Sequence, residues 1–203
     1  MAWLRETLAL FAMSSPWELF AAALALAYVF LAVKKSMWCW LAAGVSSSIY
    51  VALMFESRLY MEAALNVFFV AMAIYGYYEW RKGIERDGEF KVERWRVAEH
   101  GVALSVIALL TSINGWLLTN YTDAARPYVD SFVTWSSVVT TWMAARRIAE
   151  NWLYWMAIDA VAAVLYFQQG RAPTGVLFAI YVVIAARGFQ VWVRQPAPVT
   201  VRA

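Results

Sequence analysis

The sequence KKSMWCW at residues 34–40 returns 112 residues later as RRIAENW at residues 146–152, so that a basic pair and a final tryptophan recur. Other rare residue types recur at the same offset without a gap: Phe55, Gly76 and Trp80 return as Phe167, Gly188 and Trp192. Residues 17–80 and their counterparts share eleven identities in 64 positions. We interpret the two stretches as copies of one duplicated unit.

The composition is that of a membrane protein. Of the 203 residues, 63% are hydrophobic and 15% are charged, and the charged residues gather in short stretches between long apolar runs. A water-soluble domain would distribute its charges over its surface. Because about 20 apolar residues cross a bilayer, the runs predict an all-α protein with seven transmembrane helices, at residues 17–33, 37–55, 60–80, 96–119, 127–145, 151–169 and 173–193.

Lysine and arginine are distributed unevenly between the connections, which predicts the orientation. The connections after the first, third and fifth predicted helices, together with the C-terminal tail, hold Lys34, Lys35, Arg81, Lys82, Arg86, Lys91, Arg94, Arg96, Arg146, Arg147, Arg194 and Arg202. The opposite side holds Arg5, Arg58, Arg126 and Arg171. We therefore expect the N-terminus outside and the C-terminus in the cytoplasm.

The connections also predict how the two copies are arranged. Residues 17–80 form the first three-helix unit, and residues 81–95, where basic and acidic side chains alternate, are interpreted as a solvated cytoplasmic loop. The helix at 96–119 then crosses the membrane alone, so the second unit at 127–193 starts on the same side as the first. We expect a parallel three-plus-one-plus-three arrangement with a binding site between its halves.

Several function classes are excluded by residue types that the sequence lacks. The single Cys39 excludes disulfide exchange and most thiolate metal sites, and the lone His100 excludes a haem held by two histidines. The last three predicted helices contain no lysine for a retinal Schiff base, and no HExxH, GxSxG or P-loop motif is present. We therefore expect neither an enzyme nor a bound cofactor or metal. The net charge of +3 suits anionic lipid headgroups, not nucleic acid.

Asp159 is the strongest candidate for a functional residue. It lies eight residues after Asn151, which places it about 12 Å into the sixth predicted helix, near the membrane centre. A carboxylate at that depth is costly unless it is paired or hydrated, so function is the default interpretation. Asn151, Trp155 and Asp159 share one helical stripe, which Tyr166 extends, and this stripe suits a cationic aromatic ligand. The structural alternative is an ion pair with Arg187, and the two residues are also candidates for a gating pair.

Tryptophan is abundant, with twelve residues in the chain. Amphipathic rings gather where a membrane meets water, and this interpretation covers Trp17, Trp38, Trp40, Trp80, Trp116 and Trp192. Trp135, Trp142 and Trp155 lie deeper, where they either line a site or pack between helices. The two copies differ where chemistry needs asymmetry, because Ser47 is the counterpart of Asp159 and Tyr75 that of Arg187.

The motifs resemble those of the PnuC family of bacterial vitamin transporters. ENWLYW at residues 150–155, followed by Asp159 and LYF at 165–167, is similar to the sixth-helix signature of that family. NVFF at residues 66–69 and IYGYYEW at 74–80 resemble its third-helix motif, although Asn66 replaces the usual Gln and Tyr77 the first Trp. The heads of the first and fifth helices, Trp17-Glu18 and Asp130-Ser131, are also similar. The resemblance spans residues 15–195.

This resemblance implies a fold akin to the SWEET sugar transporters and uptake of nicotinamide riboside across the bacterial inner membrane. Transport would be facilitated diffusion, made one-way by phosphorylation of the vitamin in the cytoplasm. The family's binding residues correspond here to Asn66, Tyr75, Trp80, Asn151, Trp152, Trp155 and Asp159. The expected partners are a small cationic vitamin or nucleoside and the lipid bilayer, and the apolar surface is compatible with a homo-oligomer.

Two alternatives stay open at this point. Relatives in the family take thiamine, which also carries a cationic heteroaromatic ring, and the Trp38-Cys39-Trp40 sequence fits such members. A non-transporting membrane sensor or assembly subunit is the alternative from another class. In that case the aromatic residues would serve packing and Asp159 with Arg187 would be a structural pair.

Overall fold

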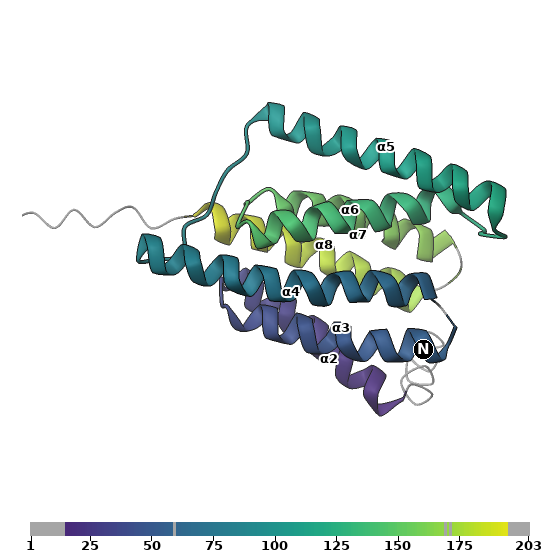
Figure 1. The fold of residues 1–203 in the computed structure, drawn as a ribbon, viewed down its shortest axis with the longest axis horizontal. Helices are drawn as coiled ribbons and strands as arrows, with labels where there is room; N and C mark the ends of the chain where they lie inside the picture. Colours follow the sequence, from purple (N-terminus) through teal and green to yellow (C-terminus); the bar gives the residue numbers. More distant parts are fainter. Residues whose placement is uncertain (1–14, 59, 169, 171, 195–203) are drawn as a thin grey trace, which may run out of the picture.

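The computed structural model describes residues 15–58, 60–168, 170 and 172–194, and the elements within them are helical (Figure 1). The helices are α2 (Pro16–Val33), α3 (Trp38–Glu56), α4 (Tyr60–Asp87), α5 (Val97–Tyr121), α6 (Pro127–Ala145), α7 (Asn151–Gln168) and α8 (Ala172–Val193). The prediction of an all-α protein with seven helices is confirmed for this part of the chain. Arg5 and Arg202 lie outside the described residues, as does Arg171.

Local sequence explains where α2 begins and ends. The Ser15 hydroxyl accepts a hydrogen bond from the Glu18 amide at 3.1 Å, and Pro16 occupies the first turn. At the other end of α2, the Ser36 amide donates to the Leu31 carbonyl at 2.9 Å and the Lys35 amide donates to Ala32 at 3.0 Å. This paired pattern is a Schellman motif, and it places Lys35 in the left-handed region with φ 58°.

The third helix is longer than predicted. We expected it to end at Trp80 and residues 81–95 to form a loop, but α4 continues to Asp87. Alternating charges support this extra length, because Arg81 and Glu85 stand four residues apart and their side chains pair at 2.8 Å. The helix stops before Gly88, whose φ of 73° suits a residue without a side chain. The connection to α5 is therefore residues 88–96.

The helices pack in two sets of three. In the first set α2 packs on α3 and α3 on α4, and in the second α6 packs on α7 and α7 on α8. The sets meet through α4 on α6 and α8 on α2. Helix α5 packs against α6 at the edge of the bundle (Figure 1).

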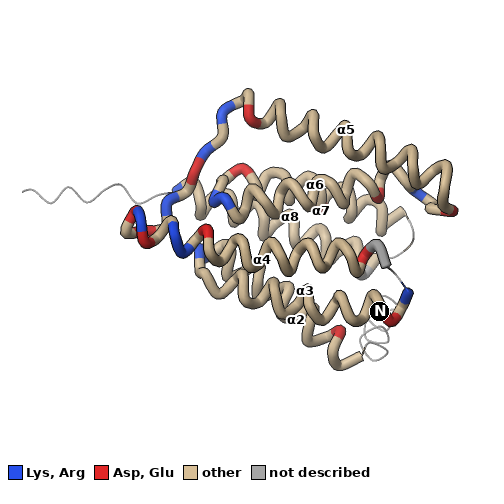
Figure 2. Tube along the Cα trace, in the orientation of Figure 1, with Lys and Arg blue, Asp and Glu red and all other residues tan. Residues whose placement is uncertain are grey.

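The charged residues gather at the two ends of the bundle, and the long middle is almost free of them (Figure 2). By length and composition, α2, α3, α5 and residues Thr174–Val193 of α8 are apolar enough to span a membrane. The other three helices carry more polar side chains, which lowers their hydropathy. In α6 these side chains are buried inside the bundle: Ser131, Ser136, Ser137, Thr140 and Thr141.

Residues related by the offset of 112 make equivalent contacts. The Trp40 ring covers Gly76 and the Trp152 ring covers Gly188 so closely that a β-carbon on either glycine would overlap the indole. Arg147 has φ 61°, close to the 58° of its counterpart Lys35.

The remaining tryptophan pair joins the two sets of helices. The Trp80 indole N–H donates to the Ala144 carbonyl at 3.1 Å, and the Trp192 indole N–H donates to the Ala32 carbonyl at 3.0 Å. Both donors and both acceptors are related by the same offset of 112. Each set thus contributes one tryptophan to the other.

The interfacial interpretation of the tryptophans is wrong for three of the six residues. Trp40, Trp80 and Trp192 are almost fully buried in the hydrophobic core, where they contact one another or their counterparts. The absence of a side chain at Gly76 leaves room for the Trp40 ring inside the bundle. Trp17, Trp38 and Trp116 are exposed, as a position at the membrane surface or facing lipid requires.

Candidate functional site

A cavity of about 230 Å³ lies between the two sets of helices. This volume is slightly below the roughly 300–1,000 Å³ of ordinary ligand sites, so the cavity suits one small molecule. Its wall is mainly aromatic: Tyr28, Trp40, Trp80, Trp152, Trp155, Phe178, Tyr181 and Trp192. The polar groups among the remaining lining residues are Cys39, Asn151 and Asp159.

Asp159 is the acidic residue of this wall. Its side chain is buried, with 8% of its surface exposed, and within the described residues it has neither an ion pair nor a hydrogen bond. The ion pair with Arg187 that we considered is not formed. Arg187 is exposed and its guanidinium donates to the Gln190 side chain at 3.3 Å. The Asp159 carboxylate therefore faces an aromatic cavity without a cation from this part of the protein.

Four pairs of repeat counterparts form a symmetric part of the wall: Ala32 with Ala144, Cys39 with Asn151, Trp40 with Trp152, and Trp80 with Trp192. The two tryptophan pairs differ in hydrogen bonding. Trp80 and Trp192 donate to backbone carbonyls, whereas the buried indole N–H groups of Trp40 and Trp152 have no partner. A buried donor without a partner is costly, and the described residues leave these two indole N–H groups unused.

The rest of the wall breaks the symmetry. Trp155 and Asp159 line the cavity from α7, and their first-unit counterparts are Ala43 and Ser47. Ala43 and Ser47 line a smaller space of about 160 Å³, which shares Tyr28, Trp40 and Trp155 with the main cavity. The Trp155 ring and the Asp159 charge thus come from the second unit. The equivalent positions of the first unit, Ala43 and Ser47, hold small side chains.

Five of the seven residues selected from the sequence lie at this cavity: Trp80, Asn151, Trp152, Trp155 and Asp159. Asn151 also ties the start of α7 to the preceding turn, because its amide donates to the Ile148 carbonyl at 2.6 Å.

Asn66 and Tyr75 lie elsewhere. The Asn66 amide donates to the Glu62 carbonyl of its own helix at 2.9 Å, and Asn66 is not among the lining residues. Tyr75 packs against the core and interacts with Arg146, whose pKa is raised chiefly by a hydrogen bond with that tyrosine. Neither side chain reaches the cavity in this conformation.

Four aromatic residues of the wall were not selected from the sequence: Tyr28, Trp40, Phe178 and Tyr181. Trp40 had a signal, because it is the counterpart of Trp152 in the repeat. The other three come from α2 and α8, and no pattern in the sequence distinguishes them from ordinary core residues.

Among the described residues, no group of three or more His, Cys, Asp or Glu side chains is placed to hold a metal ion. The lining side chains of the cavity support recognition of a small molecule, by stacking on rings and by neutralising a positive charge.

The family model described as "Nicotinamide mononucleotide transporter" matches residues 15–194. The chain belongs to the nicotinamide mononucleotide transporter family. The resemblance to PnuC drawn from the motifs is thereby confirmed, and the protein is a membrane transporter, not an enzyme.

Two relatives of this chain have different substrates in their names. The riboflavin/roseoflavin transporter RibM of Streptomyces davaonensis is 27% identical over 197 residues, which are 95% of this chain and 92% of RibM. The nicotinamide riboside transporter PnuC of Escherichia coli is 26% identical over 177 residues, 74% of each chain.

The crystal structure of a vitamin B3 transporter PnuC has the same fold. Its TM-score is 0.71 at 20% identity, and the match covers 94% of this chain and 86% of that one. Family and fold together place this protein among vitamin-type transporters.

Proposed function

We propose that this protein takes up nicotinamide riboside by facilitated diffusion. The observation that carries the proposal is Asp159, a buried carboxylate without a protein cation, at the wall of an aromatic cavity between two sets of helices. A carboxylate in such a place is stabilised by a cation. Nicotinamide riboside brings a positively charged aromatic ring and so supplies both the charge and a face for stacking.

The binding mode follows from the wall. Trp152 and Trp155 stack on the pyridinium ring, and Asp159 offsets its charge. The free indole N–H groups of Trp40 and Trp152 donate to the amide or ribose oxygens. The Asn151 carboxamide contributes a further polar group at the wall.

The transport cycle in this proposal is alternating access. The two sets, α2–α4 and α6–α8, are copies of one unit in a parallel three-plus-one-plus-three arrangement, and α5 links them across the membrane. The equivalent contacts at the offset of 112 and the cavity between the sets support this arrangement. Rocking of one set against the other would open the cavity to either side.

The membrane is the bacterial inner membrane, and the proposed orientation places the end with the basic connections in the cytoplasm. All seven helices cross it, with the N-terminus outside. Phosphorylation of the vitamin in the cytoplasm would keep it from leaving again.

Riboflavin is the second candidate substrate. It is favoured by the similarity to RibM, which extends over 95% of this chain. Its ring system is neutral, so a riboflavin site has no need of the Asp159 charge. Thiamine is cationic and aromatic, and it serves as a third compound in the test.

The test is the thermal stability of the detergent-purified protein with each compound, because a ligand that binds the native state stabilises it by mass action. We expect nicotinamide riboside to raise the melting temperature more than thiamine, riboflavin or inosine. Asp159→Asn should abolish the shift by nicotinamide riboside. The control is Asp130→Asn, which neutralises an exposed acid that does not line the cavity.

The contradicting results are specific. A shift with riboflavin alone, unchanged in Asp159→Asn, would make this a riboflavin transporter. A shift with thiamine alone would replace the substrate and keep the role of Asp159. No shift with any compound would favour the non-transporting alternative.

A further inference from the structure

Residues 88–96, which we call the strap, connect α4 to α5 across the basic end of the bundle, the end that holds the connections at residues 34–37 and 146–150 (Figure 2). The strap is attached to the second of these connections by backbone hydrogen bonds. The Glu93 amide donates to the Arg147 carbonyl at 2.9 Å, and the Ala149 amide donates to the Glu93 carbonyl at 3.0 Å. The strap thus follows the first unit in the sequence and is bound to the second in space.

Phe90 of the strap packs against two tryptophans of the cavity wall. Trp80 and Trp192 line the cavity, and the Phe90 ring packs edge-on against both, with ring centroids 4.5 Å and 5.6 Å away. A molecule that leaves the cavity toward the basic end has to pass these three rings. Phe90 is therefore the outer layer of the closure and the two tryptophans are the inner layer.

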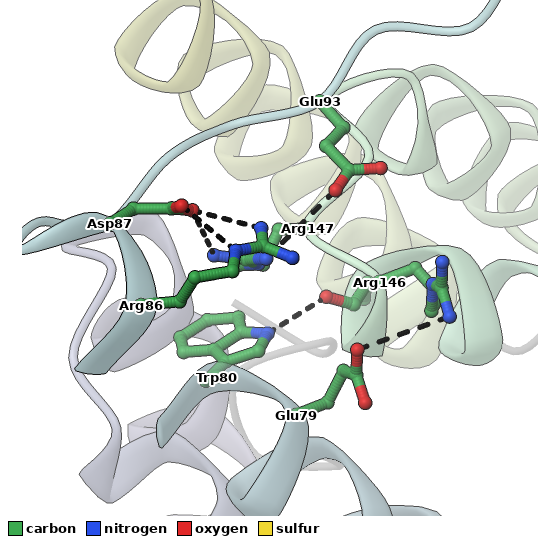
Figure 3. A network of polar contacts seen from close by, with 8 residues as sticks. Glu79, Trp80, Arg86, Asp87, Glu93, Arg146 and Arg147 are labelled. Carbon is green, nitrogen blue, oxygen red and sulfur yellow. Dashed lines mark hydrogen bonds and ion pairs between the residues drawn. The ribbon is translucent and has the colours of Figure 1, made fainter. Parts of the chain in front are cut away.

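Side chains hold the strap and the two units together at this end (Figure 3). The buried Arg147 guanidinium lies 3.8 Å from the Asp87 carboxylate and 3.9 Å from the Glu93 carboxylate. Its Nε and Nη1 atoms have no hydrogen-bond partner. Arg147 packs onto Gly83 of α4, where a β-carbon would overlap it.

Two further ion pairs cross the same boundary. Arg94 of the strap pairs with the buried carboxylate of Glu150, which also accepts from the Trp95 amide at 3.2 Å. Arg146 and Glu79 lie 3.9 Å apart (Figure 3). The hydrogen bond from Arg86 holds the pKa of the Asp87 carboxyl below its ordinary value, so this acid is ionised at neutral pH.

The closure is one-sided although the fold is repeated. The counterparts of Arg146 and Arg147 are Lys34 and Lys35, and neither lysine forms an ion pair with a described residue. Partial burial lowers the pKa of Lys35, with Glu89 opposing the change. Cross-unit ion pairs therefore concentrate where the strap meets the second unit.

We propose that the strap is a gate at the basic end: it closes the cavity when Phe90 covers Trp80 and Trp192, and it must leave the second unit for substrate to pass. Arg147, with Asp87 and Glu93, and Arg94, with Glu150, form the latch. The ion pairs of Arg147 are long and its donors are incompletely used, so the latch opens without the loss of an optimal hydrogen-bond network. This inference rests on the proposed alternating access, but not on which vitamin is carried.

The single cysteine of the chain provides the test. Cys39 lines the cavity and has no exposed surface, so its reaction with a membrane-impermeant maleimide reports access to the cavity. The reagent is added to inside-out and to right-side-out membrane vesicles of the full-length protein. In the wild type, labelling from the basic end should be slow.

Opening the gate should accelerate labelling from the basic end. We expect Phe90→Ala to accelerate it on the order of ten-fold, because the ring contacts with both tryptophans are lost. Glu93→Gln should accelerate it less, since the backbone hydrogen bonds of the strap remain. The matched control is Glu85→Gln, which breaks the exposed ion pair with Arg81 outside the strap and should label at the wild-type rate.

Charge reversal guards against misfolding as an explanation. Arg94→Glu should accelerate labelling, and Arg94→Glu combined with Glu150→Arg should restore slow labelling, which a misfolded protein would not do. The gate is contradicted if Phe90→Ala and Glu93→Gln label at the wild-type rate, if acceleration occurs only from the other face, or if Glu85→Gln has the same effect. Maleimide labelling does not require a bound vitamin. If the variants label as expected but no vitamin binds, the result rejects the proposed substrate and leaves the gate in place.

Discussion

A carboxylate inside an apolar bundle has to be paired, hydrated or protonated, because its desolvation is costly. Asp159 has neither an ion pair nor a hydrogen bond with the described residues, and its repeat counterpart Ser47 carries no charge. The residue thus combines an energetic cost with a place at the cavity wall. That combination is what separates it from the buried serines and threonines of α6, which cost far less to bury.

The free indole N–H groups lead to a prediction at the same scale. Trp40→Phe keeps an aromatic ring and removes a donor that no described atom accepts. If the ligand uses this donor, affinity should fall roughly five- to ten-fold, the equivalent of one hydrogen bond at about 1–1.5 kcal/mol. Titration of the purified protein with nicotinamide riboside measures it. The control is Trp116→Phe at an exposed site, and equal affinities for both variants would show that the donor is not used.

The glycines under the tryptophans lead to another prediction. Gly188→Ala would place a β-carbon against the Trp152 ring, and such overpacking typically costs about 1–3 kcal/mol. We expect a lower melting temperature and weaker vitamin binding, because Trp152 has to move. Gly101→Ala on α5 meets no atom within 4 Å and should leave both properties unchanged. Unchanged binding in Gly188→Ala would mean that the position of Trp152 does not matter.

Sequence alone identifies Asp159 and its helical stripe, because depth and charge are local properties. It does not identify Tyr28, Phe178 or Tyr181, since each resembles a core or lipid-facing aromatic until α2 and α8 are packed together. Asn66 shows the converse. Its polarity at membrane depth suggested a site, but its amide is satisfied by the Glu62 carbonyl one turn away.

At the level of single helices, hydropathy predicts the apolar stretch of each helix. It does not predict polar turns that continue a helix beyond that stretch. Helix α4 continues seven residues past the predicted end at Trp80 because the i, i+4 pair of Arg81 and Glu85 stabilises helix in water. The strap that follows was interpreted as solvated, yet Phe90 packs on the core. Its burial depends on Trp80 and Trp192, which are far away in the sequence.

The attachment of α5 can be tested directly. The Asn114 amide donates to the Ser131 hydroxyl of α6 at 2.9 Å, whereas the Asn120 amide donates within its own helix to Trp116. Hydrogen bonds between membrane helices contribute about 0.6 kcal/mol on average. Asn114→Ala should therefore lower the melting temperature slightly and leave vitamin affinity unchanged. An equal effect of Asn120→Ala would indicate that the contact between α5 and α6 contributes nothing specific.

At the scale of the whole molecule, the offset of 112 relates tryptophans, acceptor carbonyls and left-handed residues across the bundle. These contacts form a scaffold that the two sets of helices share. Trp155 and Asp159 differ from their counterparts Ala43 and Ser47, and they give one side of the cavity an additional ring and a charge. The rare residues that recur at this offset are visible in the sequence. The mutual donation by Trp80 and Trp192 is not, because it depends on how the two sets face each other.

Orientation is predicted at this scale too. A reporter that fluoresces only in the cytoplasm should be bright when it is fused after Arg194 and dark when the chain is truncated and fused after Asp123, since basic connections stay in the cytoplasm. The opposite pattern would invert the proposed topology, and two bright fusions would show that α6 to α8 do not cross three times.

The most direct test of the central claim is uptake of labelled nicotinamide riboside into sealed right-side-out vesicles that contain the wild type or Asp159→Asn, with labelled riboflavin as the neutral comparison. We expect saturable uptake of chemically unchanged nicotinamide riboside by the wild type. We expect roughly ten- to a hundred-fold weaker apparent affinity in Asp159→Asn, as loss of a charged partner implies. Unchanged affinity in Asp159→Asn, or uptake of riboflavin without uptake of nicotinamide riboside, would contradict this claim.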